Sequence, residues 1–136
     1  MKLLLDVNVV LDVALNRPPF VVDAALVLSA IDQGRAEGFV AAHTITTAFY
    51  IIAKNQGHQA AVTAVAEVLR ILDVVPVDRA GLSHALRLGW RDFEDAVQTV
   101  SASKIGADFI VTRDLQDFSG SPVPARDPAF VLPLLR

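Results

Sequence analysis

The sequence contains no cysteine, and it has only one tryptophan, one tyrosine and one methionine. Without cysteine the chain can form neither disulfide bonds nor thiolate metal sites. It also lacks an apolar run of the length that crosses a membrane. Asp6 interrupts the first apolar stretch well before the core of a signal peptide could form. We therefore expect a cytoplasmic protein with no membrane-spanning segment.

Basic residues are few as well. Lysine and arginine together number 12 against 15 acidic residues, which gives a net charge of −3. This balance excludes the basic stripe that holds duplex DNA by counterion release. A protein of this charge that handles nucleic acid needs cations other than its own side chains. The P-loop, the G-x-G-x-x-G pattern and the G-x-S-x-G pattern are also missing.

The composition that remains is apolar. Of the 136 residues, 53% are hydrophobic, which is high for one domain and typical of a buried parallel sheet covered by helices. We expect a single domain spanning residues 1–136. The alanine- and valine-rich segment 59–72 and the apolar C-terminal tail carry more hydrophobic surface than a monomer should expose. These segments predict a homodimer.

Apolar runs alternate with helical spacing along the chain. Strands are expected at 2–5, 38–42, 73–77 and 108–112, and helices at 9–15, 21–33, 44–55, 59–72, 80–88 and 92–105. Pro76 suggests that the third strand lies at an edge or ends there. This alternation predicts an α/β fold with a short, central, mainly parallel sheet of four or five strands, flanked by helices.

Asp6 directly follows the first apolar run, Leu3 to Leu5. In an open α/β sheet, ligands bind in the crevice beyond the carboxyl ends of the strands. A carboxylate at that place is walled by apolar core, so it is unstable unless a positive group lies against it. The alternative reading is that Asp6 or Asn8 simply caps the next helix.

Two further acidic groups stand out, at the start of the last long helix (Asp92, Glu94 and Asp95) and after the fourth strand (Asp114 and Asp117). The strand-end acids should share one edge with Asp6, whereas the helix follows another helix and its placement is open. Carboxylates held close together repel one another, and a bound cation relieves the repulsion. Hard oxygen ligands without cysteine favour Mg²⁺ or Mn²⁺ over zinc. Read singly, the acids of the helix are capping residues and those after the strand are turn residues.

The remaining charged residues show no such pattern. The three histidines (His43, His58 and His84) lack the spacing of metal ligands, so we expect them at the surface or as satisfied core residues. The scattered basic residues, which we expect to be mostly solvated surface charge, include Arg17, Lys54, Arg79, Arg87, Arg91 and Arg113.

Four motifs in order resemble those of PIN-domain proteins, and the VapC-like toxins of toxin–antitoxin pairs most of all. They are Leu-Leu-Leu-Asp6-Val-Asn8, Ala-Ala-His43-Thr-Ile-Thr46-Thr, Asp92-Phe-Glu-Asp95-Ala-Val, and Phe-Ile-Val-Thr112-Arg113-Asp114 with Asp117-Phe118. The resemblance covers nearly the whole chain. It implies a three-layer PIN-like fold and a Mg²⁺- or Mn²⁺-dependent ribonuclease that acts on RNA, is dimeric, and is held inactive by a cognate antitoxin.

The resemblance also assigns roles by position. Asp6, Asp95 and Asp114 match the first, third and fourth metal-binding acids of the family. Asn8, Thr112 and Asp117 match supporting positions. From these matches we expect one ion held by the three acids, Asp117 or Asp92 to orient the attacking water, and Asn8 to fix Asp6 by a hydrogen bond.

One position departs from the family pattern. The second acid, usually a glutamate in the third helix, falls near Thr47, and that helix contains no carboxylate. Thr46 or Thr47 could hold a metal-bound water, but a hydroxyl brings no charge. Two readings stay open at this point: a one-metal nuclease, and a degenerate module that binds RNA or a protein partner without cleaving. A phosphatase of the haloacid-dehalogenase type shares only Asp6 and lacks the second aspartate where Asn8 stands.

Overall fold

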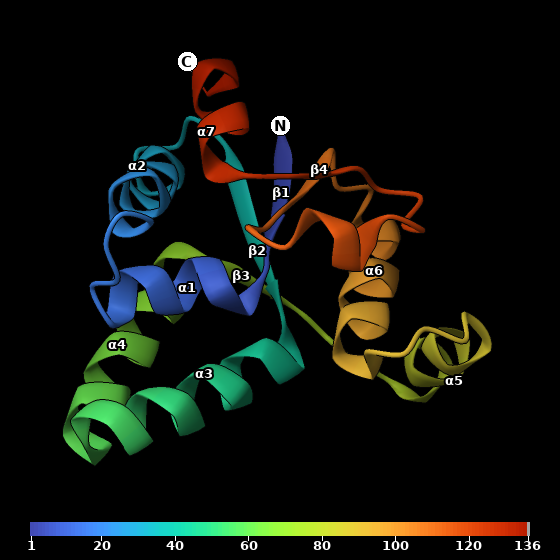
Figure 1. Ribbon diagram of the computed structural model, residues 1–136, viewed down its shortest axis with the longest axis horizontal. Helices are drawn as coiled ribbons and strands as arrows, with labels where there is room; N and C mark the ends of the chain where they lie inside the picture. The colour runs from blue at the N-terminus through green and yellow to red at the C-terminus, as the bar shows by residue number, and fades with distance from the viewer. Residues whose placement is uncertain (136) are drawn as a thin grey trace.

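The protein is built around a five-stranded sheet in which every strand runs parallel to its neighbours (Figure 1). The computed structural model describes residues 1–135. The strand order is β3-β2-β1-β4-β5, so the first strand lies in the middle. The strands are β1 (Lys2–Leu5), β2 (Glu37–Ala41), β3 (Asp73–Val75), β4 (Phe109–Val111) and β5 (Ala125–Arg126). The predicted α/β fold with a parallel central sheet is confirmed.

Helices connect the strands and account for most of the chain. They are α1 (Val7–Ala14), α2 (Val21–Asp32), α3 (Ala42–Gln56), α4 (His58–Ile71), α5 (Arg79–Arg87), α6 (Phe93–Ile105) and α7 (Pro128–Val131), with short 3₁₀ helices η1 (Leu115–Phe118) and η2 (Leu132–Leu134). Among residues 1–135, no helix combines the length and the apolar character needed to cross a membrane.

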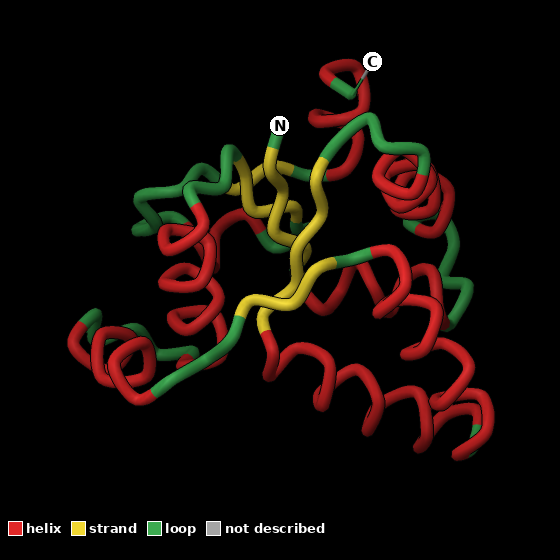
Figure 2. The backbone as a smooth tube through the Cα atoms, turned by 180° about the vertical axis from the view of Figure 1, so that it is seen from behind, coloured by secondary structure: helices red, strands yellow, loops and turns green. Residues whose placement is uncertain are grey.

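Alternation along β1 divides the core into two layers. Leu3 and Leu5 belong to a cluster formed with residues of α1 to α4 and α7, whereas Leu4 points to a second cluster with Ile110 and Ala102 of α6. All three leucines are fully buried, as expected for a strand covered on both faces. Seen from behind, the strands occupy the centre and the helices lie on both sides (Figure 2). Helix α5 packs on α6, and these two helices lie on the opposite side of the sheet from α1 to α4 (Figure 1).

Gly38 permits the close packing of β2 beneath its helices. A Cβ atom at this position would lie 2.6 Å from Cδ2 of Leu72 and 2.7 Å from Cδ1 of Ile31. Glycine is therefore favoured here by space and not by backbone conformation, since a Cβ would force the side chains of Leu72 and Ile31 to shift. The contact fixes β2 beside β1, where Leu3 pairs with Gly38.

Several predicted boundaries differ from the observed ones. Helix α1 begins at Val7, two residues before the expected start, because Asp6 accepts a hydrogen bond from the Val7 amide and serves as its N-cap. Strand β3 ends at Val75, so Pro76 does mark the end of an edge strand. Strand β5 has only two residues and no apolar run, which is why the sequence did not locate it.

Candidate active site

Asp6 and the segment from Thr112 to Asp114 lie at the same edge of the sheet. Asp6 follows β1, the segment follows β4, and the two strands pair in parallel with Leu5 opposite Val111. The backbone amide of Asp6 donates to the carbonyl oxygen of Val111 over 2.9 Å. The prediction that Asp6 and Asp114 share the carboxyl-terminal edge of the sheet is confirmed.

The Asp6 carboxylate is buried and held by three donors. Its Oδ1 accepts from the Val7 amide at 2.7 Å and from Nε2 of Gln98 at 2.8 Å, and its Oδ2 accepts from the Thr112 hydroxyl at 2.8 Å. Burial raises the pKa of Asp6 above its ordinary value, the three hydrogen bonds lower it, and the charge of Asp114 raises it further. Asp6 therefore caps α1 and also belongs to a group of neighbouring acids, Asp6, Asp95, Asp114 and Asp117, which we call the acidic cluster.

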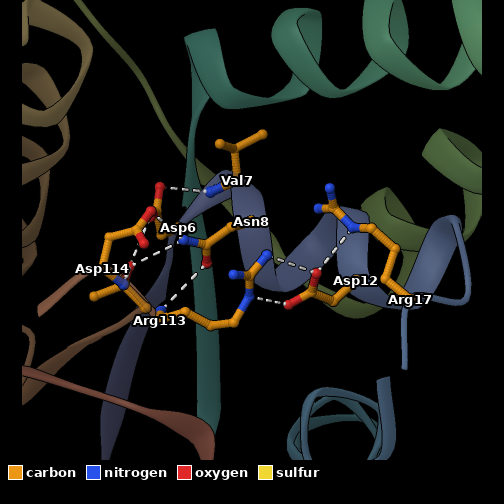
Figure 3. A network of polar contacts seen from close by, with 8 residues as sticks. Asp6, Val7, Asn8, Asp12, Arg17, Arg113 and Asp114 are labelled. Carbon is orange, nitrogen blue, oxygen red and sulfur yellow. Dashed lines mark hydrogen bonds and ion pairs between the residues drawn. The ribbon is translucent and has the colours of Figure 1, made fainter. Parts of the chain in front are cut away.

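Asn8 orients Asp114 and not Asp6 (Figure 3). Its Nδ2 donates to Oδ2 of Asp114 over 3.0 Å and to the Thr112 hydroxyl oxygen over 3.3 Å. The Thr112 oxygen also accepts from the Asp114 amide at 3.0 Å. The expected bond from Asn8 to Asp6 is not formed; Oδ2 of Asp6 accepts from the Thr112 hydroxyl instead. Thr112 thus links the two acids.

Helix α6 brings Asp95 to the same place. Asp92 caps the helix by accepting from the Asp95 amide at 3.1 Å, and Asp95 itself is only 8% exposed. Burial and then the charges of Asp6, Asp92 and Asp117 raise the pKa of Asp95 to about 7. The start of this helix therefore has both predicted roles: Asp92 caps the helix, and Asp95 belongs to the acidic cluster.

Asp117 also faces this group, since its charge contributes to the raised pKa of Asp95. The two threonines of α3 behave differently. Thr46 is exposed and its hydroxyl donates to the carbonyl oxygen of His43 in its own helix. Across residues 1–135, no hydrogen bond connects Thr46 or Thr47 to the acids.

Gln98 is a site residue that sequence reasoning missed. It is 2% exposed, and its Nε2 lies 2.8 Å from Oδ1 of Asp6 and 3.3 Å from Oδ1 of Asp95. One amide therefore bridges two carboxylates that repel each other. The available signal was its spacing, because a residue three positions after Asp95 lies on the same face of a helix.

Arg113 and Arg17 are not solvated surface charges as expected. Both contact Asp12, which is 1% exposed: Nε of Arg113 at 2.7 Å, Nη2 of Arg113 at 3.0 Å, and Nε of Arg17 at 3.0 Å. The Arg113 guanidinium also lies over the ring of Phe20, 4.0 Å from its centroid. The contacts with Asp12 and Phe20 hold Arg113, which lies between Thr112 and Asp114 in the sequence; Figure 3 shows those with Asp12.

His43 lies near the acids, at the start of α3. Its imidazole is partly buried, and burial lowers its pKa, while the negative charges of Glu94, Asp6 and Asp92 act in the opposite direction. The ring therefore favours its neutral form. The expectation of an isolated surface or core histidine overlooked this position beside the acids.

An open pocket of about 840 Å³ adjoins the acidic cluster. Asp95 and Asp117 line it together with residues from the start of α6 and the loop after η1. Buried acids with a raised pKa beside a pocket of this size are typical of a functional site.

A comparison with known protein families gives a match that includes the acids described above. Residues 2–116 match the PIN domain. The chain belongs to the PIN-domain family. The three acids Asp6, Asp95 and Asp114 all lie within the matched range.

One curated relative of this PIN-domain protein is a ribonuclease, and several solved structures resemble it in fold. Ribonuclease VapC1 of Aquifex aeolicus is 28% identical over 126 residues, which cover 87% of this chain and 85% of that protein. VapC20 of Mycobacterium tuberculosis, a toxin that cleaves the sarcin-ricin loop, has a TM-score of 0.68 at 16% identity and covers 79% of this chain and 86% of its own. VapBC2 of Rickettsia felis, bound to a DNA fragment from its promoter, has a TM-score of 0.71 at 15% identity and covers 93% and 98%. The two solved structures share the fold.

PIN-domain ribonucleases of the VapC type generally depend on divalent metal ions. The donor chemistry of this PIN domain fits such an ion, because Asp6, Asp95 and Asp114 offer hard carboxylate oxygens, and the charge of the buried Asp6 repels those of Asp95 and Asp114. Among residues 1–135, however, no group of three or more His, Cys, Asp or Glu side chains is already arranged to hold a metal. Gln98 donates to two of these acids in the present arrangement.

Proposed function

We propose that this PIN-domain protein is an endoribonuclease that cleaves single-stranded regions of RNA and serves as the toxin of a type II toxin–antitoxin pair. The observation that supports the proposal is that Asp6 lies close to two other acids: Gln98 bonds to both Asp6 and Asp95, Thr112 links Asp6 to Asp114, and the pKa of Asp95 is raised to about 7. Such a group is electrostatically unfavourable alone, and it is the chemistry that a divalent cation requires.

Mg²⁺ or Mn²⁺ is the proposed ion, with Asp6, Asp95 and Asp114 as its ligands. When bound, the ion supplies positive charge to a phosphate oxygen and lowers the pKa of a water. The protein's own residues do the positioning. Thr112 holds Asp6 and Asn8 holds Asp114, so the two strand-end acids keep a fixed orientation.

The attacking water must also be oriented, and we assign this role to acids that line the open pocket. We assign the orientation of the attacking water to Asp117, or to Asp92 from the start of α6. Both residues line the open pocket, so an RNA strand can reach them. We keep Thr46 and Thr47 as proposed positions for holding a metal-bound water. Only their position in the sequence, where the family usually has a glutamate, supports this role.

The test is cleavage of varied single-stranded RNAs with Mn²⁺ or Mg²⁺. We expect the wild type to cleave with either ion and to stop in EDTA, and we expect Asp6→Asn and Asp95→Asn to lose cleavage while keeping the fold. Asp73→Asn, an exposed acid on the far edge strand β3, is the matched control and should retain full activity. Full EDTA-sensitive activity of Asp6→Asn would overturn the assignment.

A second candidate is a non-catalytic module that binds RNA or a protein. It is favoured by the lack of an acid in α3 and by the absence, among residues 1–135, of a ready-made metal group. Its signature is a wild type that binds RNA but cleaves none of the tested substrates with Mn²⁺. The phosphatase alternative has no support, because the chain belongs to the PIN-domain family.

We also propose a homodimer and a cognate antitoxin as partners. Helix α4 exposes Val62 (40%) and Leu69 (50%), and the C-terminal segment exposes Phe130 (50%) and Leu134 (49%). These side chains support association with a second copy. Sedimentation at micromolar concentration should give a dimer, and a strict monomer would contradict the proposal. The antitoxin is expected from the neighbouring reading frame, as a protein whose addition stops RNA cleavage.

A further inference from the structure

The open pocket beside the acidic cluster has an aromatic wall that the acids do not explain. We call it the Trp90 pocket; its walls include Trp90, Arg91, Phe93, Glu94, Asp95 and Asp117. Two of these, Asp95 and Asp117, belong to the acidic cluster. A ligand in the pocket would therefore lie directly beside the proposed cleavage site.

The two aromatic side chains differ in how firmly they are held. Trp90 packs edge-on against the buried Phe118, with ring centroids 6.2 Å apart, and its ring also lies against Gly120, where a Cβ would be 3.5 Å away. Its position is thus fixed by packing. Phe93 is the first residue of α6 and is 41% exposed. Both rings line the pocket, one held by packing and the other exposed, and proteins bind the unstacked bases of single-stranded RNA by stacking them on aromatic side chains.

The polar groups of the pocket suit a base better than a phosphate. Four of the nine lining residues are acidic, and Arg91 is the one cation among them. Glu94 is exposed, and its carboxylate makes no hydrogen bond or ion pair with any other residue in the range 1–135, although its charge acts on the neighbouring His43. A free carboxylate accepts hydrogen bonds from amino groups, such as N4 of cytosine, and repels the carbonyl oxygen O4 that uracil has at the same position.

We propose that the Trp90 pocket binds one unstacked nucleobase of the RNA against Phe93 and Trp90, and that Glu94 favours bases with an exocyclic amino group over uracil. The exposed Arg91, which has no ion-pair partner within residues 1–135, lies at the wall to contact the adjoining phosphate. This subsite rests on the proposed ribonuclease function and adds to it a choice of base next to the cleaved bond.

The chain carries its own reporter, because Trp90 is its one tryptophan. The experiment adds oligocytidylate or oligouridylate of about 12 nucleotides to the Asp6→Asn variant with Mg²⁺ and follows tryptophan fluorescence. Asp6 does not line the pocket, so this variant should prevent cleavage and leave every lining side chain in place. We expect saturable quenching by both oligonucleotides, with oligocytidylate binding about fivefold more tightly.

Variants in the same background separate the parts of the pocket. Phe93→Ala should weaken binding of oligocytidylate by about tenfold, and Phe93→Leu should behave similarly because it keeps the apolar volume but not the ring. Glu94→Gln should remove the preference for cytidine. Tyr50→Ala is the matched control, since Tyr50 is an exposed aromatic residue on α3, outside the pocket, and its loss should change nothing.

The failure of this inference is distinct from the failure of the proposed function. If the wild type cleaves RNA but Trp90 fluorescence does not change, or if Phe93→Ala and Tyr50→Ala bind RNA equally, the pocket is not the base subsite. Quenching by the cognate antitoxin alone, and by neither oligonucleotide, also overturns it. A wild type that cleaves no RNA refutes the ribonuclease, and the fluorescence titration still decides whether the pocket binds a base.

Discussion

Gln98 donates a hydrogen bond from Nε2 to Oδ1 of Asp6 over 2.8 Å, although 92 positions separate the two residues in the sequence. The same nitrogen lies 3.3 Å from Oδ1 of Asp95. A neutral amide thus contacts two mutually repelling acids of the proposed site. The other end of the amide, Oε1, is buried without a hydrogen-bond partner among the described residues. The side chain therefore contacts the two acids through its nitrogen while its own oxygen stays without a hydrogen bond.

Gln98→Leu should therefore impair cleavage more than folding. The substitution removes the link between Asp6 and Asp95, and we expect kcat to fall by about tenfold or more, as for other residues that orient metal ligands. It also removes an unsatisfied buried carbonyl, which offsets part of the cost of taking a donor from the two buried carboxylates, so we expect only a modest decrease in the urea midpoint. Gln98→Glu adds a negative charge and should lower the Mn²⁺ concentration that gives half-maximal activity.

Gln59→Leu, an exposed glutamine on α4, is the control for this pair. The measurements are steady-state cleavage across a Mn²⁺ titration and urea unfolding. A Gln98→Leu protein with wild-type kcat and an unchanged Mn²⁺ midpoint would show that the amide does not position the acids.

The ion pair between Asp12 and Arg113 supports a second prediction. Because Asp12 is 1% exposed and contacts two arginines, Asp12→Asn leaves those arginines without their counter-charge. Removing one partner of a fully buried ion pair costs about 3–5 kcal/mol of folding free energy. The cost here should be smaller, because the side chains of Arg17 and Arg113 are 38% and 26% exposed. Asp32→Asn, which breaks the exposed contact with Arg70, should change the unfolding free energy much less. Equal effects of the two substitutions in urea unfolding would contradict the structural role of Asp12.

Gly38 supports a third prediction. The Cβ of Gly38→Ala would lie within 2.8 Å of atoms of both Ile31 and Leu72, so these side chains must move. Overpacking of this kind destabilises a core by about 1–3 kcal/mol. Gly120→Ala is the control, since its Cβ would meet the ring of Trp90 at an ordinary 3.5 Å. A thermal melt in which Gly38→Ala matches the wild type would show that β2 tolerates the added methyl group.

The sequence predicted the strand-end acids because their position follows from local pattern alone. An apolar run that ends in an aspartate places that aspartate at the carboxyl end of a strand, and parallel strands share that edge. This argument was sufficient for Asp6 and Asp114. It could not place Asp95, because α6 follows a helix, and here the family resemblance supplied the position.

The contacts that hold the acids were beyond such reasoning. Arg113 and Asp12 are 101 positions apart, and nothing in their local sequence marks them as partners. Thr112 was known as a supporting position, but its partner, Asp6, emerges only when β1 lies beside β4. The short strand β5 has no apolar pattern of its own and is defined by its pairing with β4.

The raised pKa of Asp95 gives a prediction for the metal-free protein. Its pKa is about 7 in the folded chain against an ordinary 3.8, because of burial and then the charges of Asp6, Asp92 and Asp117. Between about pH 4 and pH 7 the folded protein therefore keeps a proton that the unfolded chain has released. Stability from this group is fully present below that window, decreases as the pH rises through it, and stays low above it.

Asp95→Asn cannot ionise, so it should avoid this loss. In EDTA we expect the urea midpoints of Asp95→Asn and wild type to be nearly equal at about pH 4 and to separate progressively toward pH 8, with the variant more stable. Asp73→Asn, an exposed acid outside the cluster, should show no such pH-dependent difference. Adding Mn²⁺ at pH 8 should raise the wild-type midpoint more than that of Asp95→Asn, because the ion binds the ionised carboxylate. A difference between wild type and Asp95→Asn that stays constant from pH 4 to pH 8 would mean that Asp95 ionises as freely in the folded protein as in the unfolded chain.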